Sequence, residues 1–526
     1  MDQIKFWILA LITVVTAGAE TAHASCVISG NAAGNGDYLA RRLATLSSCP
    51  NNVFQLRASF VSDGMQLRTT LVANRGFHNP SQGSFSLFEL LSGRSQSTPI
   101  RLDQGQFFFG HFTAAQGSQL VADQNPTQGA LMVELIAWDF SKKVFNFYEL
   151  IGDGTQGRWF YRGDSHDIQR DLRFLHLQPN PGQPQFGQTL RCAGCHMNGG
   201  PIMKELEMPH NDWWMPERIL DSGGRVPDPA LADVLKTLVP AEALAQSVKT
   251  GVIGLHSSGV QATLSLREKL RPLFCPMEIN FESDLKPSDS AQTIRVASGF
   301  FVDPRLARVQ IAVSKSAYDA GMRAQGMRFP ETHRTDGDHA FLTPVKAFSD
   351  MMAVENLRKS GLVDDEFITD ILAIDLTNPV VSPARCGLLR LVPESESGHW
   401  REQFATAIKN ALAQATAVRS PWAPVLNEAF TNLMDPARNA AFHRARANRF
   451  LQACSQRASV VPSVAHWIQL LAQRRAEVRA SEISKNPRGQ ILEPGFRVIF
   501  PEPTIPSAPG KLRLDESCEL SQFRTG

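Results

Sequence analysis

Two cysteines three positions apart, followed at once by a histidine, are the feature that most constrains this chain of 526 residues. They are Cys192, Cys195 and His196, in the run TLRCAGCHMNGG. Thiols at this spacing can add across the two vinyl groups of a haem, and the histidine can then place its imidazole under the iron. Gly194 lets the backbone approach the porphyrin edge. The motif predicts one covalent haem c, with Cys192 and Cys195 as attachment residues and His196 as the proximal iron ligand.

Other chemistries of a CxxC pair fit the flanking sequence less well. A thioredoxin-type pair lies between a strand and a helix of a βαβ unit, whereas here Pro179, Pro181 and Pro184 precede the motif and Gly199-Gly200-Pro201 follows it. A zinc site needs a second ligand pair at similar spacing, and the other cysteines are isolated. A structural disulfide or a metal clip is the alternative to haem.

The N-terminus has the pattern of a secretory signal peptide. A weakly charged start is followed by the apolar run Phe6–Thr16 and by small residues at Ala22 and Ala24. This pattern predicts a signal peptide over residues 1–24 and a mature chain that begins at Ser25. The apolar run is short for a membrane span, and no later segment is apolar for long enough, so no transmembrane segment is expected after cleavage. Because bacteria attach haem to CxxCH outside the cytoplasmic membrane, the motif and the signal together predict a periplasmic or secreted protein.

The net charge and the cysteine content indicate which partners and which cellular compartment to expect. The net charge is +2 and charged residues make up 20% of the chain, which gives no strong field for nucleic acid. Six cysteines remain outside the motif, an even number that predicts disulfides in an exported chain, with free buried thiols as the alternative. Cys26–Cys49 is the pair expected first, because it closes a local loop, and the other pairings stay open. The six are Cys26, Cys49, Cys275, Cys386, Cys454 and Cys518.

The region 25–177 is expected to be rich in β-structure. Leu131–Phe140 and Val144–Leu150 predict a hairpin about Ser141-Lys142-Lys143, with aromatic side chains paired across it. Several glycines beyond the hairpin predict loops. A β-sandwich or a small barrel is the expected architecture. The hairpin aromatics are Trp138, Phe145, Phe147 and Tyr148.

The pattern then changes to helices, so the whole chain is predicted to be a multidomain α+β protein. Residues 178–281 form the haem-binding region: a proline-rich linker (178–187), the motif, a helix beginning at Asp228-Pro229, a short helix that ends near Gly251, and a helix over Leu264–Phe274. Residues 282–526 are expected to be mainly α-helical, with an extended proline-rich tail from Pro494 that Cys518 ties down. Helices are predicted around Trp400–Leu412, from Asp435-Pro436 to Cys454, and from Ser463 to Leu471.

Around the motif, over about 190–215, the chain resembles the small cytochromes c, which place CxxCH near the start of a helix and take a second axial ligand from a distant loop. Its length and the position of the motif differ from theirs. As a whole it is similar to large bacterial exported proteins that carry a cytochrome c segment. That resemblance implies haem and redox capacity, and it gives no substrate.

The second axial ligand is expected close to the motif. Gly199-Gly200-Pro201 interrupts any helix after His196, so the chain can fold around the haem edge. His210, Met203 and Met208 are the candidate distal ligands, against the alternatives of ordinary core methionines, a surface histidine, or a remote or absent ligand. Trp213 and Trp214 are expected to cover the porphyrin or to fill the core.

Three functions follow as hypotheses. The first is electron transfer through the covalent haem, with a redox partner protein. The second is a haem enzyme of peroxidase or oxygenase type, although a single CxxCH excludes a di-haem peroxidase. The third is an envelope-associated binding protein with a structural or sensory haem. The polar loop with His333 and His339 is expected to be a solvated turn rather than a metal site, and no Gly-x-Ser-x-Gly elbow is present.

Overall fold

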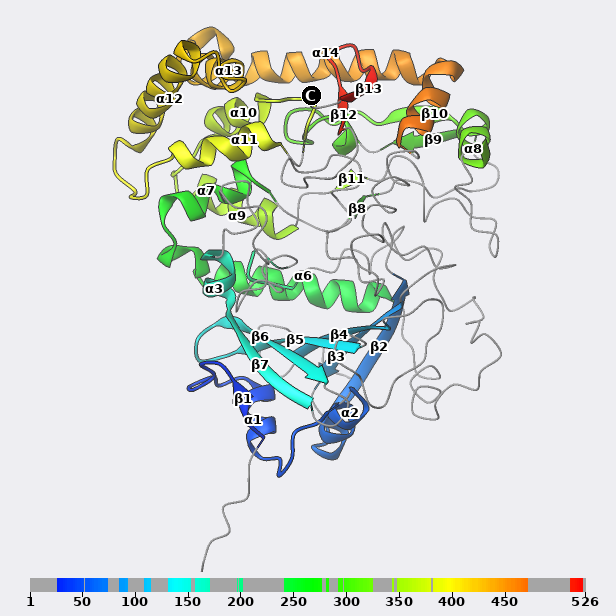
Figure 1. The fold of residues 1–526 in the computed structure, drawn as a ribbon, viewed down its shortest axis with the longest axis vertical. Coiled ribbons are helices and arrows are strands. Elements are labelled where there is room, and N and C mark those ends of the chain that lie inside the picture. Colours follow the sequence, from blue (N-terminus) through cyan, green and yellow to red (C-terminus); the bar gives the residue numbers. More distant parts are fainter. Residues whose placement is uncertain are drawn as a thin grey trace, which may run out of the picture.

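The structure is a computed structural model that joins a β-sheet with a set of helices (Figure 1), so the chain is a mixed α+β protein as predicted. It describes residues 26–51, 53–73, 85–92, 108–114, 131–152, 157–170, 196, 198–201, 241–276, 281–282, 292–296, 298–324, 343–344, 348–379, 382–471 and 511–523. The predicted signal peptide, the proline-rich linker, the helix at Asp228 and the loop of His333 and His339 lie outside these residues.

The N-terminal part is built on one seven-stranded sheet, with the strand order β1-β7-β6-β5-β4-β3-β2. Neighbouring strands from β2 to β7 are antiparallel, and β1 is parallel to β7. These strands form a single open sheet, covered by helices, in place of the predicted sandwich or barrel. The strands are β1 (Ile28–Ser29), β2 (Gln66–Ala73), β3 (Phe85–Ser92), β4 (Phe108–Ala114), β5 (Leu131–Asp139), β6 (Val144–Gly152) and β7 (Gly157–Asp164).

The predicted hairpin is confirmed as β5–β6. Trp138 lies opposite Phe145, and their rings meet edge to face with centroids 4.8 Å apart. The turn closes through a hydrogen bond from the amide of Lys143 to the carbonyl of Asp139, 2.7 Å. Successive residues of β6 point to opposite faces of the sheet, so Phe147 and Tyr148, both buried, pack on different sides.

The Tyr148 side of the sheet is covered by α1 (Tyr38–Ala44) and α2 (Val53–Ser62). Asp37 caps α1 by accepting from the amide of Ala40 at 2.9 Å, and its other oxygen accepts from the Tyr148 hydroxyl at 2.5 Å. Burial raises the pKa of Asp37 above its ordinary value. The disulfide Cys26–Cys49 closes this segment, which confirms the pairing expected from the sequence.

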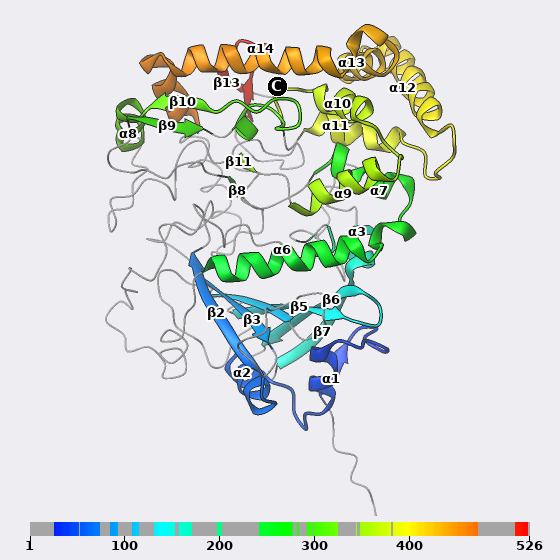
Figure 2. The same ribbon diagram turned by 180° about the vertical axis from the view of Figure 1, so that it is seen from behind.

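The side of the sheet away from α1 carries α3 (Ser165–Arg170) and α6 (Ala241–Ser257), as Figures 1 and 2 show from two sides. The predicted stop near Gly251 is wrong, because α6 continues for six residues beyond it. Val252 and Leu255, which follow that glycine, are buried. Their packing outweighs the cost of about 1 kcal/mol that a glycine brings to a helix interior.

The helical part beyond α6 shares one hydrophobic core, to which the predicted helices contribute. The helix expected over Leu264–Phe274 is α7 (Leu266–Phe274), with a capping box between Ser265 and Glu268. The helix expected at Trp400 is confirmed as α12. The remaining elements are α8 (Lys315–Ala324), α9 (Phe348–Lys359), α10 (Asp365–Ala373), α11 (Pro383–Leu388), α12 (Trp400–Ala417), α13 (Ala423–Met434), α14 (Ala440–Ala458), β8 (Phe281–Glu282), β9 (Thr293–Val296), β10 (Ile311–Ser314) and β11 (Thr343–Pro344).

Two helix starts differ from the prediction. Asp435-Pro436 opens only a 3₁₀ turn over Pro436–Arg438, and α14 begins after Asn439, whose side chain accepts from the amide of Phe442. The next helix covers 461–471. It therefore begins two residues before Ser463, which was the expected N-cap. Its predicted inward face is confirmed, since Val464, Trp467, Ile468 and Leu471 are all buried.

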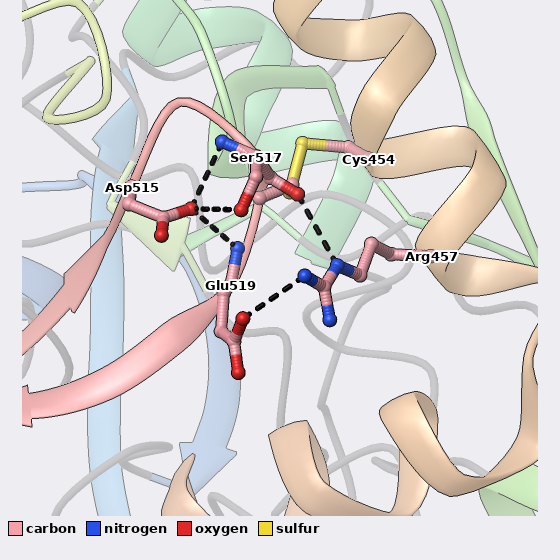
Figure 3. Close-up of a disulfide and its surroundings, with 6 residues drawn as sticks. Cys454, Arg457, Asp515, Ser517 and Glu519 are labelled. Atoms are coloured by element: carbon pink, nitrogen blue, oxygen red, sulfur yellow. Dashed lines mark hydrogen bonds and ion pairs between the residues drawn. A yellow bond between two sulfur atoms is a disulfide. The ribbon is translucent and has the colours of Figure 1, made fainter.

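The tail ends in a hairpin that a disulfide holds against α14. Strands β12 (Lys511–Leu514) and β13 (Leu520–Phe523) pair antiparallel, and Cys518 between them is bonded to Cys454 of α14. Asp515 organises the turn by accepting from the amides of Ser517 and Glu519, and Arg457 of α14 contacts Glu519 at 2.9 Å (Figure 3). Together with Cys275–Cys386, which joins the end of α7 to α11, these bonds confirm that the six non-motif cysteines form disulfides.

Candidate functional site

His196 is buried against the sheet, with 8% of its surface exposed. Its Nδ1 lies 2.9 Å from the carbonyl oxygen of Gly200. A carbonyl oxygen only accepts, so Nδ1 carries the proton, and in the neutral ring Nε2 is the nitrogen with the lone pair. The ring also packs on Phe147 of β6, with centroids 5.6 Å apart. The imidazole is therefore fixed both in tautomer and in orientation.

The turn that holds His196 in place requires glycine at position 199. The amide of Gly199 donates to the carbonyl of His196 at 2.7 Å, and its φ is +71°. A Cβ at this position would lie 2.6 Å from the carbonyl oxygen of Ser165, a distance that real side chains do not tolerate. The sequence prediction that the glycines break a helix after His196 agrees with this turn.

Ser165, at the start of α3, ties the turn to the sheet. Its hydroxyl donates to the carbonyl of Gly199 at 2.6 Å and accepts from the amide of Phe145 at 2.9 Å. A second tie comes from Gln169, whose Nε2 donates to the carbonyl of Asn198 at 2.7 Å. Buried backbone carbonyls need such partners, and these two bonds fix the segment relative to β6.

The opposite side of the turn meets α6 and α7. Gly200 packs against Leu255 of α6 so closely that a Cβ there would lie 3.0 Å from Leu255 Cδ2. The amide oxygen of Asn198 accepts from the guanidinium of Arg271 on α7. Arg271 also forms a buried ion pair with Asp350 of α9, 3.1 Å. The 196–201 segment thus joins the sheet to the helical part through hydrogen-bonded contacts.

A second buried histidine lies in the same neighbourhood. His256, near the end of α6, has its Nε2 2.8 Å from the hydroxyl of Ser349. Burial, and then the positive charge of Arg271, lower the pKa of His256 to about 4. His256 is therefore neutral at pH 7.

Of the residues predicted from sequence for the haem site, the structure places only His196. Cys192, Cys195 and the candidate distal ligands Met203, Met208 and His210 lie outside the described residues, as do Trp213 and Trp214. Sequence reasoning did not single out Asn198, Arg271, Asp350 or His256. The sequence did contain a signal for Arg271. It lies next to Leu270 on the buried face of α7, and a charged side chain on a buried face needs a partner.

The donor set fits a covalently attached haem. Metal-ligating histidines commonly donate their other ring nitrogen to a carbonyl or carboxylate, and His196 makes this bond to Gly200. The sequence places two thiols one and four positions before His196, at Cys195 and Cys192. Among the residues that the structure describes, those around His196 included, no group of three or more His, Cys, Asp or Glu side chains is arranged to hold a metal ion. None of the helices in those ranges is long and apolar enough to cross a membrane.

Comparisons with known proteins give no relative for this chain: no protein-family model, no curated protein and no solved structure matches it at a significant level.

Proposed function

We propose that this protein is an exported monohaem c-type cytochrome that carries out electron transfer. Cys192 and Cys195 would hold the haem through thioether bonds, and Nε2 of His196 would ligate its iron. The bound haem would supply reversible one-electron exchange between Fe(III) and Fe(II). A redox partner protein would deliver or accept the electron.

One observation supports this proposal above all others: the histidine of the CxxCH motif is buried, and its Nδ1 donates to the carbonyl of Gly200. A surface histidine of a chance motif has no need of a fixed tautomer. A histidine that ligates iron does, because the lone pair of Nε2 has to point at the metal.

The surrounding residues have roles that suit electron transfer. Gly199 and Ser165 fix the turn, so the imidazole keeps one orientation during a change of charge at the iron. Phe147 of the sheet is fully buried and packs on the imidazole, so it keeps water from this side of the histidine. A rigid, water-poor environment favours electron transfer because little has to rearrange when the electron arrives.

Export is supported by the cysteines. Three disulfides are typical of proteins that fold in oxidising compartments outside the cytoplasm. In the proposal, the segment 1–24 directs the chain to the periplasm or beyond, where haem attachment takes place.

Staining for haem-linked peroxidase activity on a denaturing gel tests the proposal. The protein is produced in a bacterial host that has the cytochrome c assembly proteins. We expect a stained wild-type band, and a weak or missing band for Cys192→Ser and Cys195→Ser. Cys49→Ser is the matched control, because it also removes a cysteine but one that belongs to a disulfide, and its band should stain. An unstained wild-type band contradicts the proposal.

A further inference from the structure

Arg271 has one nitrogen without a partner in the described part of the chain. The residue is 4% exposed. One terminal nitrogen, NH2, donates to Asn198 Oδ1 and to Asp350 Oδ1. The other, NH1, is buried and has no hydrogen-bond acceptor among the described residues. Leaving a charged N–H group buried without an acceptor costs more than a single hydrogen bond contributes. An acceptor from outside this set is therefore expected at NH1.

The chemistry of the guanidinium favours an anion as that acceptor, because hydrogen bonds between two charged groups are about twice as strong as those between neutral groups. Asp350 of α9 is the acid paired with Arg271 in the described ranges. His256 of α6, whose pKa the Arg271 charge lowers, is neutral at pH 7 and brings no second positive charge. Arginine in a water-poor site pairs best with a planar carboxylate, which accepts from two of its N–H groups.

The position of Arg271 relative to His196 indicates which carboxylate this is. Asn198, which accepts from Arg271, is two residues from His196, a backbone span of at most about 7 Å. The turn between them is closed by the bond from the Gly199 amide to the His196 carbonyl. A haem ligated by His196 would bring two propionate carboxylates into the region that Arg271 shares with this turn.

We propose that NH1 of Arg271 holds a propionate carboxylate of the haem bound at His196. The inference rests on the proposed function, and it adds a residue from α7 to a site otherwise defined by 192–201. In this arrangement Arg271 joins the haem, the turn at Asn198 and α9 through Asp350. The positive charge of Arg271 then stabilises the ferrous state, which carries one positive charge less on the iron.

Redox titration of the purified holoprotein, followed by its visible spectrum, tests this proposal with two variants of opposite expected sign. Arg271→Gln removes the positive charge and leaves the propionate uncompensated, so at a fixed solution potential the ferric-to-ferrous ratio should rise about tenfold. Asp350→Asn leaves the Arg271 charge uncompensated, so the ratio should fall. Lys269→Gln is the matched control, because it removes a positive charge from the same helix, one that is paired with Glu396, and should leave the ratio unchanged.

The pH dependence identifies the partner as a carboxylate. A propionate that loses its arginine titrates at a higher pH, so the potential of Arg271→Gln should fall between about pH 5 and 8, where that of the wild type is flat. The other titratable groups facing Arg271 are Asp350 and His256. Because Arg271 lowers the pKa of His256, Arg271→Gln combined with His256→Gln is the control, and its potential should keep the same pH dependence.

Each outcome decides the matter. Opposite shifts in the two variants support the proposal. An unchanged ratio in Arg271→Gln, or a shift of both variants in the same direction, overturns it, because loosened packing exposes the haem to water equally in either variant. If Arg271→Gln does not fold, Asp350→Asn takes its place: its ratio should fall, and an unchanged ratio overturns the proposal. Wild-type protein without covalent haem contradicts the proposed function itself, whereas haem-bearing wild type with an insensitive potential contradicts only the role of Arg271.

Discussion

Nδ1 of His196 donates a hydrogen bond to the carbonyl oxygen of Gly200, four positions further along the chain, at 2.9 Å. Because the acceptor is a backbone carbonyl, the conformation of this turn determines which ring nitrogen of His196 carries the proton. Any change that distorts the turn should therefore loosen the imidazole, even when it leaves the CxxCH residues intact.

Gly199→Ala tests the turn directly. The φ of +71° and the approach of a Cβ to within 2.6 Å of the Ser165 carbonyl oxygen predict a loss of stability and of haem attachment. Gly259→Ala is the control, since its φ is +78° but nothing lies within 4 Å of its Cβ. Strain alone should cost the control about 1–2 kcal/mol, and Gly199→Ala should cost clearly more in urea unfolding. Equal losses would show that the contact with Ser165 carries no energy.

The hairpin β5–β6 and the buried faces of α7, α12 and 461–471 could be predicted from the sequence, because each follows a local period of apolar residues. The disulfide Cys26–Cys49 could be predicted because the loop is short. The end of α6 could not be predicted. Gly251 favours the end of a helix, but the packing of Val252 and Leu255 outweighs this preference. Nor could the neighbours of His196 be predicted: Arg271 and Asp350 are more than 70 residues further along the chain and meet it only after folding.

Stability should fall as the pH falls through the titration range of His256. Its folded-state pKa of about 4 lies below the ordinary value of 6.5, so between these values the unfolded chain binds more protons than the folded one. The free energy of unfolding should therefore decrease from pH 6.5 to pH 4, by about 3 kcal/mol in full. Denaturant unfolding across this range measures the slope. His256→Gln should flatten it, whereas the exposed His466→Gln should not; an unchanged slope in His256→Gln would contradict the assignment.

Loss of the tail disulfide should destabilise the helical part. Cys454 and Cys518 are separated by 64 residues, and closing a loop of that length stabilises by about 4 kcal/mol in the chain-entropy model. Cys518→Ser should lower the guanidinium midpoint and make the tail hairpin sensitive to limited proteolysis. Arg457→Gln removes a half-exposed ion pair with Glu519 and a hydrogen bond from Nε to the carbonyl of Ser517, and it should cost about 1 kcal/mol. If both variants behave alike, the disulfide does not hold the hairpin.

The sixth iron ligand separates electron transfer from the enzyme alternative. The turn at Gly199–Pro201 brings the chain back immediately after His196, so we expect a local ligand and a low-spin, six-coordinate ferric iron, with His210 ahead of Met203 and Met208. The ferric spectra of His210→Ala, Met203→Ala and Met208→Ala are the measurement, and the variant that lacks the ligand should become high-spin. A high-spin wild type that responds to peroxide and is unaffected by all three substitutions would favour a peroxidase- or oxygenase-like enzyme.

The central claim is tested most directly by the visible spectrum of the reduced protein after extraction with acidified acetone, which removes haem that is not covalently bound. Protein matured in a host with cytochrome c assembly is predicted to keep its haem and to show the sharp ferrous bands of a c-type cytochrome. Protein that is colourless after extraction, from a host that loads a known cytochrome c in parallel, would contradict covalent attachment at Cys192 and Cys195, and with it the proposed function.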